Sequence, residues 1–219
     1  MQPPSTERSA EPSFLGLISA IPDFGLAVTF LLTWMDPART GGAPMVANLL
    51  LVILMEFITI HASGVLGSVI FSDAGSPQRV RKLLGMGLFY AVFVLSFVAM
   101  FKQWWPAWSF ALLLGNRLLT VILDRQPDEA QKRRIQGGWA LSVLFFLVFV
   151  ALTTFIPLPA LGIASVHMPP QLQPGGGVWN NEPWRLLAFG VLYFAAQGIA
   201  EVVGALYRPS RTNATAGQH

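Results

Sequence analysis

The chain has 219 residues, of which 53% are apolar and 11% charged, whereas about a quarter of the residues in an ordinary soluble domain are charged. The net charge is only +3 and the basic residues lie in short segments between apolar runs, so the composition indicates a membrane protein and gives no reason to expect nucleic-acid binding. The absence of cysteine excludes disulfides, zinc–thiolate sites, iron–sulfur clusters and cysteine nucleophiles.

The chain opens with a polar, proline-containing segment over residues 1–13, which we predict to be a lead-in without regular structure. A signal peptide would need a basic first region, but Arg8 is flanked by Glu7 and Glu11. We therefore expect the apolar run over 14–35 to be retained as the first transmembrane span.

Pro22 interrupts this first span and is followed by Asp23. One interpretation is a kinked helix whose Asp23 points into a bundle, because proline removes one helix hydrogen bond. A second starts the helix at Pro22, with the carboxylate in the first turn, where it suits the helix dipole. We favour the kink, because the shorter helix would be about 21 Å long against a hydrocarbon core of about 30 Å.

Five more apolar runs are long enough to cross a bilayer. They are predicted at 45–71, 83–101, 104–123, 137–156 and 184–207, and a polar tail follows over 208–219. The sequence thus predicts an all-α polytopic integral membrane protein, with one domain over 14–207 built as a six-helix transmembrane bundle.

The distribution of Lys and Arg predicts the orientation, because these residues are concentrated in cytoplasmic segments. Ten lie on the side of the termini, three lie on the opposite side, and Arg117 lies inside a span. The ten are Arg8, Arg79, Arg81, Lys82, Arg125, Lys132, Arg133, Arg134, Arg208 and Arg211; the three are Arg39, Lys102 and Arg185. We predict a protein of the inner (plasma) membrane with both termini in the cytoplasm.

The outer side carries two further features. Six of the seven tryptophans fall on or near the outer boundary, as in an aromatic belt. The outer loop over 157–183 is longer than a connection requires, so it is either a lid or partner contact, or a Pro/Gly-rich tether.

Ionisable residues inside spans are costly and often mark functional sites. There are five, namely Asp23, Glu56, His61, Arg117 and Glu201. From the helical rise, the first two lie near the midplane, the next two about 5 Å toward the cytoplasm, and the last about 8 Å.

These depths support two interpretations. In the first, Arg117 and Glu201 form a structural ion pair that His61 can join, and this pair sets how the spans dock. In the second, Asp23 and Glu56 have no cation of their own, so they are protonated, share a bound cation or contact water. Asp23, Glu56 and His61 would then form an ion, proton or solute site.

His61 is the only one of the three histidines inside a span, so a haem held by two histidines of one chain is not expected. Met55 or Met100 is the alternative second ligand. Glu56 and His61 are five residues apart, about 140° around a helix, and so do not share a face as metal ligands would. We predict no cofactor and no metal site.

Small residues predict close helix packing in two spans. In the second span they are Ser63, Gly64, Gly67 and Ser68, and in the sixth they include Gly198 and Gly204. We expect these faces to bring the second and sixth spans together, or to join two copies of the chain or a membrane protein partner.

The sequence lacks the phosphate-binding G-x-x-x-x-G-K-[ST], H-E-x-x-H and G-x-S-x-G patterns. We predict a non-enzymatic membrane component, such as an assembly partner, regulator or subunit, whose constant partner is the lipid bilayer. The alternatives are a small proton- or cation-coupled carrier or channel that uses the midplane carboxylates, and a membrane protein that holds haem or another cofactor. The absence of an inverted repeat in the sequence argues against the carrier interpretation.

Overall fold

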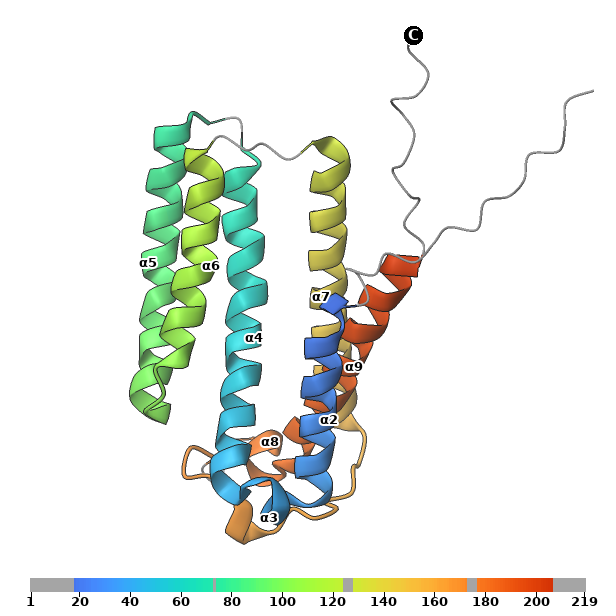
Figure 1. The fold of residues 1–219 in the computed structure, drawn as a ribbon. Helices are drawn as coiled ribbons and strands as arrows, with labels where there is room; N and C mark the ends of the chain where they lie inside the picture. The colour runs from blue at the N-terminus through green and yellow to red at the C-terminus, as the bar shows by residue number, and fades with distance from the viewer. Residues whose placement is uncertain (1–17, 73, 124–127, 173–176, 207–219) are drawn as a thin grey trace, which may run out of the picture.

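The computed structural model describes residues 18–72, 74–123, 128–172 and 177–206 (Figure 1). Within these ranges helix is the only regular secondary structure, which confirms the all-α prediction there. The predicted polar segments over 1–13 and 208–219 lie outside the described residues, as do the first residues of the first predicted span.

The described residues form eight α-helices and one short 3₁₀ helix, η1 (Ser165–His167). The α-helices are α2 (Ile21–Met35), α3 (Pro37–Thr40), α4 (Gly42–Ile70), α5 (Ser76–Phe101), α6 (Trp105–Ile122), α7 (Glu129–Phe155), α8 (Val178–Asn181) and α9 (Trp184–Leu206). Four of them, α4, α5, α7 and α9, are long and apolar enough to cross a membrane. Helix α2 has 15 residues and α6 has 18, and neither is among these four.

Helix α2 begins close to the proline that the sequence marked. The chain makes a turn at Ala20, and Pro22 and Asp23 lie in the first turn of α2. This agrees with the second interpretation, in which Asp23 lies near the positive end of the helix dipole. Residues 18 and 19 are helical as well, and Ala20 has helical backbone angles (φ −76°, ψ −16°), so the described part of this span is also compatible with the kink that we favoured.

Parts of the two charged connections that we predicted between spans, 72–82 and 124–136, are helical. Helix α5 starts at Ser76 with Pro77 in its first turn, and α7 starts at Glu129. The Asp128 side chain caps α7 by accepting a hydrogen bond from the Gln131 amide at 2.6 Å. The prediction ended each span where apolar residues ended, but Glu, Gln, Lys and Arg are good helix formers and extend the helices beyond the apolar run.

Figure 1 shows two groups of helices, with α4, α5 and α6 side by side on one flank and α2, α7 and α9 on the other. Helix α4 contributes to both hydrophobic cores. Its Leu51, Met55 and Leu66 pack with α5 and α6, whereas Leu49 and Ile53 pack with α2 and α9. Helix α4 therefore joins the two groups.

The segment that we predicted as the outer loop packs against the end of α2. The Trp34 indole N–H donates to the Pro159 carbonyl at 3.1 Å, and the Gly162 amide donates to the Trp34 carbonyl at 3.1 Å. Ile163 is buried in the second core. The described parts of this loop are thus docked on the bundle, as a lid or contact surface would be and a free tether would not.

Candidate functional site

The clearest polar site lies between α4 and α9, inside the second group of helices. The Tyr193 hydroxyl donates a hydrogen bond of 2.6 Å to Oε1 of Glu56. Tyr193 is fully buried and Glu56 is half-buried. Because a polar group in hydrocarbon must find a partner within the protein, this bond satisfies two costly groups at once.

Gln197 extends the site to a third helix. Its side-chain amide donates to the Tyr193 oxygen at 3.0 Å and to Oγ of Ser142, on α7, at 2.7 Å. The Ser142 hydroxyl in turn donates to the Gly138 carbonyl at 3.2 Å. Since the Tyr193 oxygen accepts from Gln197, its own proton is directed to Glu56. We call Glu56, Tyr193, Gln197 and Ser142 the polar network.

Aromatic rings enclose the Tyr193 end of this network. The Tyr193 ring stacks on Phe189 with a centroid distance of 5.5 Å and an interplanar angle of 8°. Phe146 and Phe194 meet it edge-on at 5.7 and 5.1 Å. Edge-to-face and offset-stacked pairs are favourable geometries, so the aromatic packing holds the hydroxyl in place toward Glu56.

Two further carboxylates lie on the same side of the bundle. Asp23, which is half-buried on α2, is within electrostatic reach of both Glu56 and Glu201. Ion pairs between described residues are instead short-range pairs at helix ends, such as Arg39–Asp36 and Arg185–Glu182. Asp23 on α2 is thus within electrostatic reach of one carboxylate on α4 and of one on α9, and the ion, proton or solute site that we predicted stays a prediction.

The structure does not bring Arg117 and Glu201 together. Arg117 is on α6, which packs on α5 and α4, whereas Glu201 is on α9, which packs mainly on α2 and α7 (Figure 1). Their ion pair is not among those that the described residues form. Their similar predicted depths had suggested the pair, but the two helices lie in different groups.

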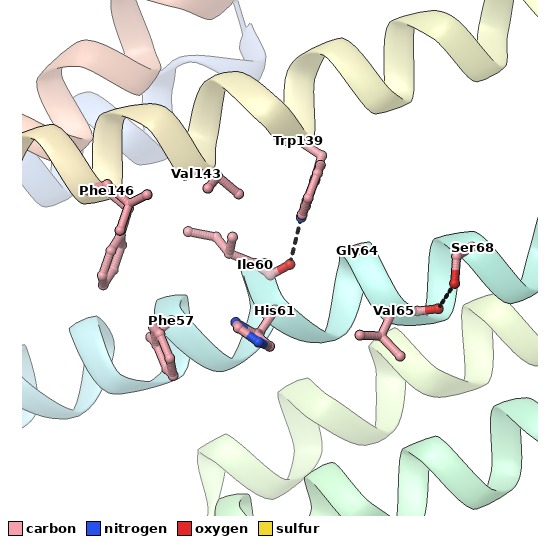
Figure 2. A pocket seen from close by; sticks show the side chains of 10 residues that line it. Phe57, Ile60, His61, Gly64, Val65, Ser68, Trp139, Val143 and Phe146 are labelled. Carbon is pink, nitrogen blue, oxygen red and sulfur yellow. Dashed lines mark hydrogen bonds between the residues drawn. The ribbon is translucent and has the colours of Figure 1, made fainter.

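His61 is also separated from the polar network, because it is exposed on another face of α4. It lines a pocket of about 550 Å³ between α4 and α7, with Phe57, Gly64, Trp139 and Phe146 among the other lining residues (Figure 2). Its ring lies 5.4 Å from that of Phe57. His61 therefore belongs to a lateral pocket and not to a joint site with Asp23 and Glu56.

The small residues of α4 face α7, so they do not bring the second and sixth predicted spans together, which was one of the alternatives that we gave. A Cβ atom added to Gly64 would lie 2.7 Å from Cζ2 of Trp139, whose indole N–H donates to the Ile60 carbonyl at 2.9 Å (Figure 2). Ser63, Gly67 and Ser68 line an adjoining pocket of about 230 Å³. The flat surface of α4 thus receives one large side chain of α7, because the indole fits where a Cβ is missing.

On α9, the small residue Gly198 packs against α2. Gly198 is buried, and its added Cβ would lie 3.0 Å from the Phe24 ring, whereas Gly204 is exposed with no atom within 4 Å. Gly190, which the sequence analysis did not select, is the tightest of the α9 glycines, since its added Cβ would lie 2.2 Å from Cδ1 of Phe30.

Sequence reasoning missed Tyr193 and Ser142 in the network and Trp139 beside the pocket. Two signals were present. Tyr193 is one of three tyrosines, lies mid-span and is four residues before Gln197, on the same helix face. Trp139 is the one tryptophan outside the predicted outer belt, so its position indicated a role other than that of a belt residue.

Comparison of the chain with protein-family models, with curated proteins and with solved structures found no match. The class of protein therefore comes from the fold itself. It is an all-helical chain in its described residues, with four apolar helices whose length and composition suit a transmembrane protein.

Proposed function

We propose that the chain is a six-span protein of the inner membrane with both termini in the cytoplasm. The four long apolar helices support this, and α2 and α6 would supply the two remaining spans. The basic residues support the orientation, because Arg81 and Lys82 lie in the second turn of α5 and Arg133 and Arg134 in the second turn of α7. Both helices begin at the same end of the bundle (Figure 1).

We further propose that it acts as a non-enzymatic membrane component, such as an assembly partner, regulator or subunit. The observation that carries this is the direction of the hydrogen bonds in the polar network. Tyr193 donates to Glu56 on α4 and Gln197 donates to Ser142 on α7, while a third hydrogen bond within α9 links Gln197 to Tyr193, so the network joins α4, α7 and α9. Groups that are satisfied in this way suit a role in helix docking, which a scaffold for other membrane proteins needs.

The first prediction tests that structural role. Tyr193→Phe should lower the free energy of unfolding in mild detergent by about 1 kcal/mol, within the range measured for hydrogen bonds between membrane helices. Glu56→Gln is the matched variant, because its amide oxygen still accepts from Tyr193, and it should melt like wild type. Thermal unfolding monitored by circular dichroism measures both; equal losses for the two variants would contradict the proposed network.

The same proteins decide between this function and a proton-linked carrier. The carrier is the second candidate because Asp23, Glu56 and Glu201 gather three carboxylates near one another. In liposomes loaded with a pH-sensitive dye, the wild type should pass protons no faster than empty liposomes. If the wild type passes protons, and Glu56→Gln abolishes this flux without changing stability, the carrier function would be supported and the scaffold function rejected.

A further inference from the structure

The two pockets beside α4 form one lateral groove. They share Gly64, Ser68 and Trp139, and they run along α7 from Ile135 to Leu147. At about 1.5 Å per residue this stretch is about 18 Å long, a little over half of a hydrocarbon core of about 30 Å. We call this the α4–α7 groove, and its length suits a ligand that occupies a single leaflet.

The basic end of the groove is the second observation. The Lys132 ammonium lies 5.6 Å from the centroid of the Phe71 ring, which lines the smaller pocket. Arg133 and Arg134 follow it, and Glu129, which Lys132 contacts at 3.6 Å, is exposed. The apolar groove therefore begins beneath a cluster of cations at the end of the bundle that we place in the cytoplasm.

Trp139 limits what the groove can hold. Its indole reaches from α7 to the Ile60 carbonyl of α4 and so crosses the groove (Figure 2). A helix is about 10 Å wide and cannot lie between α4 and α7 at that point. A flexible acyl chain can pass over the face of the indole, from the Gln136 end to the Phe146 end.

We infer that the α4–α7 groove binds an anionic phospholipid of the cytoplasmic leaflet. One acyl chain lies along Ser68, Trp139 and Phe146, and the phosphate lies at Lys132. Basic pockets at the cytoplasmic ends of transmembrane helices suit anionic headgroups, because the phosphate gains a charge partner while its chain stays in hydrocarbon. The inference rests on the proposed membrane-spanning function.

Native mass spectrometry in mild detergent tests it, with equal amounts of phosphatidylglycerol and phosphatidylethanolamine that carry identical acyl chains. Wild type should retain the anionic lipid preferentially, and Lys132→Gln should lower that preference about fivefold, the factor that corresponds to about one basic residue near a headgroup. Equal retention of the two lipids by wild type would overturn the site.

Ser68→Phe should fill the groove and cut lipid retention severalfold. Its matched control is Ser96→Phe on α5, because both serines are exposed and both hydroxyls donate to carbonyls of their own helix, at 2.7 and 2.8 Å. Equal retention by the two variants would overturn the inference. So would a wild-type dimer that Ser68→Phe separates, since a second copy would then cover the groove.

A substitution at His61 distinguishes a phospholipid from other ligands, because His61 lines the larger pocket, whereas Lys132 lies beside the smaller one. His61→Leu should leave the preference for the anionic lipid unchanged. A loss of binding in His61→Leu but not in Lys132→Gln would indicate a ligand with a deep polar group and overturn the phospholipid. Release of the chain from membranes by alkaline carbonate would instead refute the membrane-spanning function, which separates the two failures.

Discussion

Gly190→Ala is expected to destabilise the protein by about 3 kcal/mol, near the upper range for overpacking a well-packed interior. The added Cβ would lie 2.2, 2.4 and 2.5 Å from three atoms of the Phe30 ring. That ring is fully buried and stacks on Phe194 at 5.6 Å, so it has no open space into which to turn. Relief requires α2 and α9 to separate, and this is the most extensive helix contact in the described structure.

The matched control for this prediction is Gly204→Ala on the same helix. No atom lies within 4 Å of its added Cβ, so the variant should melt at or slightly above the wild-type temperature, because alanine favours helix. Thermal melting in one detergent compares the two. Phe30→Leu should partly rescue Gly190→Ala, because it removes the ring atoms that clash. Equal melting of Gly190→Ala and Gly204→Ala would show that α2 and α9 do not pack closely.

Arg185→Met is expected to cost about 3 kcal/mol, as removal of one partner from a buried ionic contact commonly does. The side chain is 10% exposed, and Nη1 donates to the carbonyls of Thr153, Thr154 and Ile156 at 2.8, 3.2 and 2.8 Å. These are carbonyls from the last turn of α7, which have no partner within the helix. The variant leaves them unsatisfied and also removes the 2.7 Å contact with Glu182.

Arg39→Met is the control for Arg185→Met, because Arg39 also pairs with an acidic residue three positions away, at 3.0 Å. The Arg39 side chain is 89% exposed, so its loss should change the free energy of unfolding by less than about 1 kcal/mol. Hydrogen exchange adds a local measure, since amides over 157–172 should exchange faster only in Arg185→Met. Similar melting and exchange in the two variants would mean that Arg185 does not hold the end of α7.

Much of the site's inventory could be predicted from the sequence, but its pairings could not. Depth along each span follows from the helical rise, which places Asp23 and Glu56 at one level, and the two carboxylates are within electrostatic reach of one another. The same reasoning paired Arg117 with Glu201, which α6 and α9 keep apart. Depth is one coordinate, and a contact also needs the right neighbouring helix and the right face of each helix.

Arg185 shows the same division. The sequence identified it only as one of three basic residues on the outer side, and its role in capping α7 depends on the end of a helix that is 29 residues away in the chain. Trp139 and Gly64 are likewise 75 positions apart, and their fit is visible only when α4 and α7 are placed side by side.

The sequence by itself determined that this is an apolar, helical chain with polar residues at known depths, because composition and run length are enough to recognise helices suited to a bilayer. Only the tertiary structure decided which faces meet. In a soluble protein, apolar periodicity in the sequence identifies the buried face of a helix. Lipid is as apolar as leucine, so the sequence of a membrane helix distinguishes its buried face from its lipid-facing side only weakly. Their docking depends instead on local fits, such as Phe30 against Gly190, Trp139 against Gly64, and the Tyr193 hydroxyl against Glu56.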